Sequence, residues 1–151
     1  MSTATSSSES PKPKYRMHWH VLFTHFPLAL FVVTFGFQVL HLIYPSANFE
    51  LAANVTLIAG AFIMIPTALS GWLTWKSHYK GAKVPLFKKK IGIAFAMLIF
   101  SIALVLWRIL AYSFTKDMPV GPSHWFYFAG SLLLILGAAA EGYYGGKLNH
   151  R

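Results

Sequence analysis

Four apolar stretches, each long enough to cross a lipid bilayer, constrain the fold of this chain more than any other feature. A transmembrane helix needs about 20 consecutive apolar residues, and the stretches cover residues 21–44, 49–75, 91–112 and 124–144. Hydrophobic residues make up 56% of the sequence and charged residues only 11%, which leaves too few charges to coat a soluble core. The sequence therefore predicts an all-α, integral membrane four-helix bundle that forms one domain over residues 17–151.

Basic residues are distributed unevenly among the segments outside these stretches. Eleven of the 13 Lys and Arg residues fall in the N-terminal tail, in the lysine-rich loop 76–90 and at the C-terminal end. Because cytoplasmic segments of membrane proteins carry an excess of Lys and Arg, this distribution predicts that both termini are cytoplasmic. The same rule accounts for the net charge of +9 without a nucleic-acid partner. The Ser- and Thr-rich tail, residues 1–16, is predicted to be disordered.

The absence of cysteine excludes several kinds of chemistry. A chain with no cysteine has no disulfides, thiolate metal sites or iron–sulfur ligands, and no covalent haem attachment through Cys-x-x-Cys-His. The sequence also lacks the nucleophile elbow and the paired metal ligands that are typical of hydrolases. An electron-transfer role stays open, and the ionisable residues inside the predicted spans are its candidates.

Histidines near the ends of the spans are candidate ligands for haem b, which imidazoles commonly bind. Two pairings place imidazoles of different helices at one depth: His25 with His78 or another cytoplasmic-side histidine, or His41 with His124. In the second pairing an arginine could meet the haem propionates. The cofactor-binding candidates are therefore His20, His25, His41, His78, His124 and Arg108. Alternatively, the histidines are ordinary interfacial residues and Arg108 extends to the headgroups.

Helical geometry favours one haem over two. His25 and His41 are separated by about 160° around an ideal helix, whereas His20 and His41 are separated by about 60°. His25, the candidate ligand of the haem iron, therefore does not share a face with His41 unless the helix kinks at Pro27.

Glu141 lies among small residues near the end of the fourth stretch. A carboxylate there either pairs with a cation such as Lys90 or stays protonated, so Glu141 could serve a quinone or a proton path, or form a simple interfacial salt bridge. Small residues let helix backbones approach closely, and the spacing predicts that this helix is the packing hub of the bundle or a dimer contact. The glycines concerned are Gly137, Gly142, Gly145 and Gly146.

Two prolines fall within the predicted spans. Pro27 lies either inside the first helix, where it leaves the Phe23 carbonyl without its helical partner, or in the first turn. Pro66 lies in the middle of the second stretch. With Glu141, it would be a pathway element if the protein were a small transporter.

Three short motifs resemble those of a bacterial family of four-span membrane proteins, domain of unknown function 2231. The similarity covers residues 18–150 in order. The family opens with His-Pro-x-x-x-His-Phe-Pro, and the matching segments here are His20 with His25-Phe26-Pro27, Ser70-Gly71-Trp72-x-x-Trp75, and Gly142-x-x-Gly145-Gly146-Lys147. Val21 replaces the first proline, and residues 90–94 lack a histidine that many relatives carry, which would be a natural second haem ligand.

The resemblance implies a bacterial cytoplasmic membrane protein in a redox setting, because some members of the family are fused to Rieske-type iron–sulfur domains. We therefore predict a haem b, quinone-linked electron-transfer subunit with a membrane redox partner. The alternative is a non-catalytic subunit that anchors or assembles a larger complex, as a homo- or hetero-oligomer. The lysine-rich loop would then be its docking surface or its contact with anionic lipid. A transporter is the third hypothesis.

Overall fold

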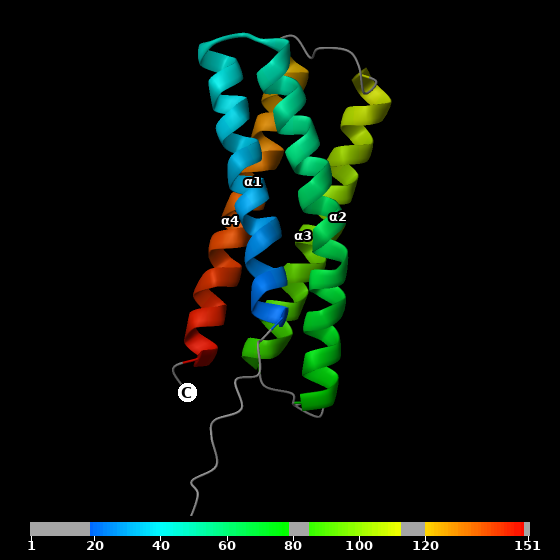
Figure 1. Ribbon diagram of the computed structural model, residues 1–151, viewed down its shortest axis with the longest axis vertical. Helices are drawn as coiled ribbons and strands as arrows, with labels where there is room; N and C mark the ends of the chain where they lie inside the picture. Colours follow the sequence, from blue (N-terminus) through cyan, green and yellow to red (C-terminus); the bar gives the residue numbers. More distant parts are fainter. Residues whose placement is uncertain (1–18, 79–84, 113–119, 150–151) are drawn as a thin grey trace, which may run out of the picture.

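The computed structural model describes residues 19–78, 85–112 and 120–149, which form four long helices (Figure 1). These are α1 (Trp19–Ile43), α2 (Ala47–His78), α3 (Pro85–Tyr112) and α4 (Pro122–Asn149). Each contains a segment long and apolar enough to cross a membrane, namely Thr24–Ile43, Ala47–Lys76, Pro85–Leu110 and Pro122–Lys147. The predicted all-α membrane bundle is confirmed. The N-terminal tail lies outside the described residues.

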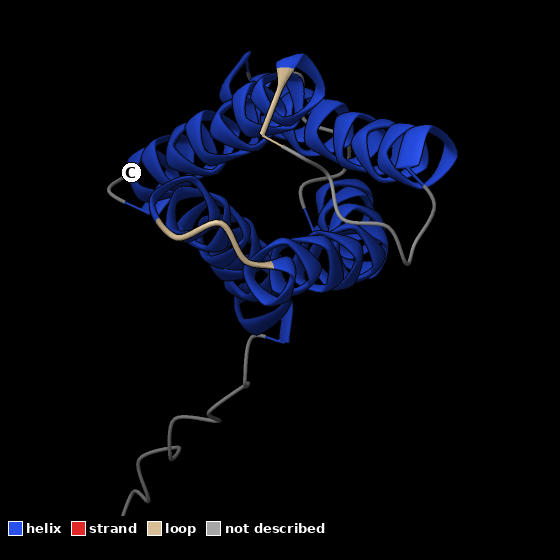
Figure 2. Ribbon diagram, turned by 90° about the horizontal axis from the view of Figure 1, so that it is seen from above, coloured by secondary structure: helices blue, strands red, loops and turns tan. Residues whose placement is uncertain are grey.

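The four helices form a closed ring (Figure 2). Each helix packs against the next one along the chain, and α4 also packs against α1. A short turn around Ser46 joins α1 to α2. The Ser46 hydroxyl accepts a hydrogen bond from the Asn48 N–H at 3.3 Å, and its carbonyl accepts one from the Phe49 N–H at 3.1 Å. Ser46 thus caps the start of α2.

The helices extend beyond the apolar stretches that predict them. α3 begins at Pro85 rather than at residue 91, so Lys88, Lys89 and Lys90 are helical and not part of the expected loop. Proline is preorganised for a first helical turn, and the long lysine stems let the ammonium groups reach the polar interface from a helix. α1 begins at Trp19, which places Pro27 in the helix interior, the first of the two alternatives.

Large apolar side chains pack in the middle of the bundle, beside small buried polar ones such as Thr34 and Ser101. The buried apolar side chains include Phe31, Leu57, Met64, Leu104 and Leu134. The outer surface is also apolar: Leu110 is 84% exposed and Phe62 is 73% exposed. In a membrane, such exposed apolar side chains contact the hydrocarbon of the bilayer.

Candidate functional site

A cluster of polar side chains is buried at the end of the bundle that carries the α1–α2 turn. Every helix contributes to it, and each side chain is at most 5% exposed. We call it the turn-end cluster: Gln38 and His41 of α1, Glu50 and Asn54 of α2, Arg108 of α3, and His124 and Tyr127 of α4. Ionisable groups inside a membrane are costly and mark functional sites. The turn-end cluster is the first candidate site.

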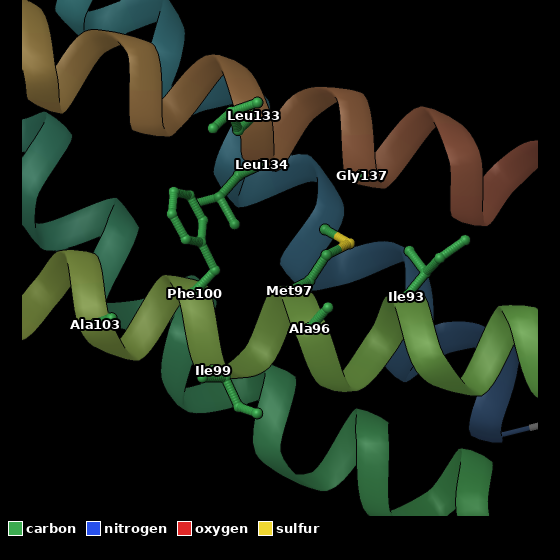
Figure 3. A pocket seen from close by; sticks show the side chains of 9 residues that line it. All are labelled: Ile93, Ala96, Met97, Ile99, Phe100, Ala103, Leu133, Leu134 and Gly137. Carbon is green, nitrogen blue, oxygen red and sulfur yellow. The ribbon is translucent and has the colours of Figure 1, made fainter.

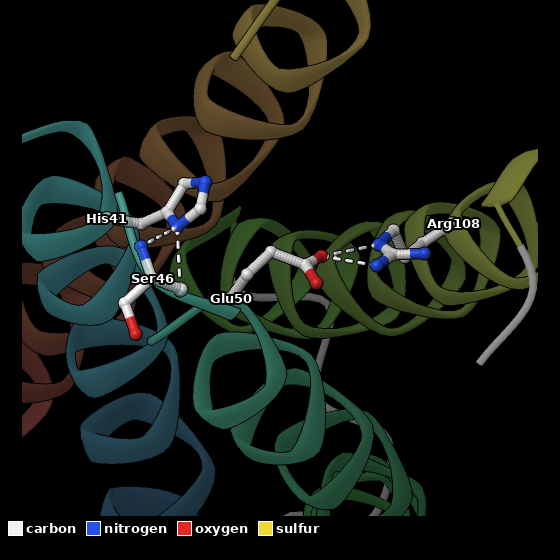
Figure 4. Close-up of polar contacts among 4 residues, drawn as sticks. All are labelled: His41, Ser46, Glu50 and Arg108. Carbon is white, nitrogen blue, oxygen red and sulfur yellow. Dashed lines mark hydrogen bonds and ion pairs between the residues drawn. The ribbon is translucent and has the colours of Figure 1, made fainter. Parts of the chain in front are cut away.

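An ion pair between Glu50 and Arg108 joins α2 to α3 (Figure 4). The Arg108 Nε donates a hydrogen bond to Glu50 Oε1 at 2.8 Å, and Nη2 donates to the same oxygen. The guanidinium also lies 5.6 Å from the centre of the Tyr112 ring. Glu50 stands in the first turn of α2, where the positive end of the helix dipole favours a carboxylate. The two buried charges therefore compensate each other.

Two imidazoles meet beside this ion pair. The ring centres of His41 and His124 are 5.2 Å apart, with the planes tilted by 38°. His41 Nδ1 lies 2.9 Å from the Ser46 carbonyl oxygen (Figure 4). One turn deeper, Gln38 Nε2 donates a hydrogen bond to the Ser131 hydroxyl at 2.7 Å. The structure thus brings together the second predicted histidine pair within the buried cluster.

A haem does not fit between His41 and His124 as they lie. Bis-histidine ligation places the iron and the porphyrin plane between two imidazole nitrogens. A ring separation of 5.2 Å is that of a directly packed aromatic pair. Arg108, the expected partner of the propionates, is engaged by Glu50 instead. To admit a haem here, α1 and α4 would have to move apart.

The other candidate haem ligands, His20, His25 and His78, belong to helix segments toward the opposite end of the bundle. The His25 side chain is exposed on α1. His20 and His78 belong to α1 and α2, but their side chains lie outside the described part, so their pairing with His25 stays a prediction. Among the described residues, no group of three or more His, Asp or Glu side chains is placed to hold a metal ion.

An apolar groove runs between α3 and α4 (Figure 3). Its volume is about 580 Å³, and the residues that line it are all apolar. Figure 3 shows Phe100 and Leu134 on opposite sides of the groove, and Met97 directed toward Gly137. A β-carbon at Gly137 would lie 2.9 Å from the Met97 side chain, so glycine permits the close approach of the two helices here.

Glu141 lies beyond one end of this groove. It follows Gly137 by one helical turn on the same face of α4, and it is only 4% exposed. Its Oε1 atom has no hydrogen-bond partner within the described residues. Lys90, which precedes the groove residue Ile93 by about one turn of α3, interacts electrostatically with the carboxylate. The groove and these two charged residues form the second candidate site.

Comparison with known proteins identifies the family. A family model described as predicted membrane protein (DUF2231) matches residues 17–151. The chain belongs to this family. No curated protein and no solved structure matches it. The resemblance inferred from the sequence motifs is thus confirmed, and the DUF2231 protein is a membrane protein with four candidate spans.

The family motifs of this DUF2231 protein lie on its helices. Pro27 is buried inside α1, whereas Phe26 is 54% exposed. Near the end of α2, the Lys76 ammonium lies 5.2 Å from the centre of the Trp72 ring. Gly145 approaches Lys90: a β-carbon there would lie 3.4 Å from Lys90 Nζ. These motifs lie at the end of the bundle opposite the turn-end cluster.

Sequence reasoning missed four members of the turn-end cluster. Glu50 was the most informative of them, because an acidic residue at the start of one span can meet an arginine at the end of the next. Asn54 follows Glu50 by one turn, which places both on one face of α2. Polar residues inside apolar stretches were the available signal for the remaining two, Gln38 and Tyr127.

Proposed function

We propose that this protein is a quinone-linked redox subunit of the membrane, and that the groove between α3 and α4 binds the quinone. The observation that carries this proposal is an apolar groove on the lipid-facing surface, with a buried carboxylate, Glu141, one helical turn of α4 beyond the groove residue Gly137. A volume of about 580 Å³ falls within the usual range of ligand pockets.

The chemistry of a quinone matches both parts of this site. Its isoprenoid tail is apolar and would lie along the groove, against side chains such as Phe100 and Leu134. Its ring carbonyls accept hydrogen bonds and take up protons on reduction. Glu141 can exchange a proton with such a ring, and the Lys90 ammonium can donate a hydrogen bond to it. Electrons would come from, or pass to, a partner protein of the membrane.

A photoreactive quinone with an isoprenoid tail tests this proposal on the full chain in lipid nanodiscs. We expect the label on α3 and α4 peptides, and we expect unlabelled quinone to compete for it. Ala96, exposed and lining the groove, can be enlarged without touching the core. Ala96→Trp should weaken binding about tenfold or more, equivalent to about 1.4 kcal/mol.

The matched control is Ala29→Trp, on the exposed side of α1 and outside the groove. It should leave labelling unchanged. Equal labelling of both variants, or labelling spread over all four helices, would mean that quinone merely dissolves in the surrounding lipid, and would refute the site.

Haem b remains part of the redox proposal at the end of the bundle that carries His25. Visible spectra of the purified protein, oxidised and then reduced with dithionite, test it. A reduced α-band that is lost in His25→Ala but retained in His124→Ala would support ligation at that end. A flat spectrum from folded protein prepared with ample haem would exclude a resident haem and leave the quinone site to be judged alone.

A second candidate function is that of a non-catalytic subunit within a larger assembly. It is favoured by Gly142 and Gly146 on α4, where an added β-carbon would meet nothing within 4 Å among the described residues. Such a surface lets another helix approach closely. If another helix packs on this surface, Gly142→Leu should dissociate an oligomer detected by native mass spectrometry. Gly36→Leu is the control, because Gly36 is equally open on α1, and it should leave the oligomer intact.

A further inference from the structure

The imidazole pair of the turn-end cluster contains nitrogen atoms that the protein leaves unsatisfied. Within the described helices, neither ring nitrogen of His124 has a hydrogen-bond partner, and nor does His41 Nε2. His124 is 0% exposed and His41 is 5% exposed. Buried polar atoms are almost always hydrogen-bonded. Three orphaned nitrogens on two rings in contact therefore point to a ligand that both rings bind.

The contact with Ser46 determines which nitrogen of His41 is available. We assign the 2.9 Å contact between Nδ1 and the Ser46 carbonyl oxygen as a hydrogen bond that Nδ1–H donates, since a carbonyl only accepts. This contact is shorter than the 3.3 Å from the Ser46 backbone nitrogen to the same Nδ1. In a neutral imidazole the second nitrogen is then an acceptor. His41 Nε2 accordingly carries a free lone pair in the buried cluster.

We propose that His41 and His124 bind one proton between them, directly or through an ordered water molecule. Each neutral ring carries one N–H and one lone pair, so one additional proton lets an imidazolium N–H of one ring donate to the lone pair of the other. The site is therefore a proton-binding site built from α1 and α4, separate from the proposed quinone site. Apart from the Ser46 carbonyl that orients His41 and any bridging water, the site uses only groups of the turn-end cluster.

The charges on all four helices limit the site to a single proton. Glu50 of α2 faces the cluster with a negative charge, and Arg108 of α3 compensates it through the ion pair. Tyr127 of α4 is the remaining titratable group, and it interacts electrostatically with Glu50 and Arg108. With no uncompensated carboxylate in the cluster, a second imidazolium in contact with the first would be strongly opposed by like-charge repulsion.

The position of the pair determines the side from which the proton arrives. His41 contacts Ser46 in the α1–α2 turn, next to Tyr44, which is 66% exposed. In the opposite direction, buried apolar side chains such as Phe31 and Leu57 pack in the middle of the bundle. The turn end is thus the nearer route to water, and we expect the site to exchange protons with that side of the bilayer.

Nuclear magnetic resonance of ¹⁵N-histidine in the full chain, in nanodiscs, tests this proposal between about pH 8 and about pH 5, where imidazoles ordinarily titrate. The signals of His41 and His124 should change together, in one step. In His41→Gln, the titration midpoint of His124 should move by about one pH unit or more, as expected for coupled groups. In the control His25→Gln, on the exposed face of α1, it should not move.

Two results would overturn the proposal. Both rings could stay neutral across the range, or each could take up its own proton independently of the other. If a variant fails to fold, the titration of the wild-type protein still tests the proposal. The resonances of His41 and His124 can then be assigned from magnetisation transfer between the two neighbouring rings. None of these outcomes depends on quinone. A negative titration result therefore does not affect the proposed quinone site, and a negative quinone-labelling result does not affect the proposed proton-binding site.

Discussion

The Glu50–Arg108 ion pair is the residue-scale feature whose removal should have the largest effect. Removing one partner of a buried pair leaves an uncompensated charge and costs about 3–5 kcal/mol, whereas replacing both with uncharged residues costs far less. We expect Glu50→Gln and Arg108→Met each to destabilise the protein by several kcal/mol, and the double variant to recover most of the loss. The free energy of unfolding of the three variants, measured in mixed detergent micelles, tests this expectation.

A matched control for the ion-pair variants is Lys76→Met, because the Lys76 side chain is exposed near the other end of α2. Lys76→Met should leave the free energy of unfolding nearly unchanged. A double variant that loses as much as the two single variants added together would show that the groups act independently, contrary to the geometry of the pair.

At the residue scale, the sequence indicates three of the seven members of the turn-end cluster. Ionisable residues in apolar stretches are conspicuous, which is why the sequence indicates His41, Arg108 and His124. The number of basic residues on each side of the membrane places all three at the same end. Glu50 was missed because a carboxylate beside a turn resembles an ordinary interfacial residue. Only the packing of α2 against α3 brings it to Arg108. Arg108 also shows that a long side chain near the interface need not extend to the headgroups.

At the element scale, the approach of α3 to α4 depends on the glycine that faces Met97. In Gly137→Ala the new β-carbon would lie 2.9 Å from Met97 Cγ and Sδ, and overpacking of this kind costs about 1–3 kcal/mol. Gly142→Ala meets nothing within 4 Å in the part of the chain described. It should be neutral or gain up to about 1 kcal/mol from helix propensity.

Thermal unfolding of both variants in the same detergent distinguishes them. Equal stability would mean that Met97 moves aside without cost, and that close packing at Gly137 does not hold the two helices together.

The helices themselves could be predicted from hydropathy, but their ends and partners could not. Apolar length identified all four, since a bilayer requires about 20 such residues. The start of α3 was placed too late because three consecutive lysines resemble a loop, although Pro85 can begin a helix before them. The contact of α4 with α1 depends on side-chain packing between segments far apart in the sequence, which no local pattern encodes.

At the scale of the whole molecule, the two candidate sites lie toward opposite ends of the bundle. The turn-end cluster is buried among the four helices. The α3–α4 groove is open to lipid, and Glu141 lies beyond one of its ends. The distribution of basic residues predicts which side each end faces. Lys76 and Lys147 should be cytoplasmic, and the α1–α2 turn should face the other side. The proton-binding site would then draw on the non-cytoplasmic phase.

Single-cysteine labelling can establish this sidedness cleanly because the chain has no cysteine of its own. Tyr44 and Val120 are exposed at one end of the bundle, and Lys76 and Lys147 are exposed at the other. In intact cells, a membrane-impermeant maleimide should label Tyr44→Cys and Val120→Cys. It should label Lys76→Cys and Lys147→Cys only after the membrane is permeabilised, because positively charged segments stay on the cytoplasmic side. The reverse pattern would invert the topology and assign the imidazole pair to the cytoplasmic phase, while labelling of all four in intact cells would exclude a fixed orientation.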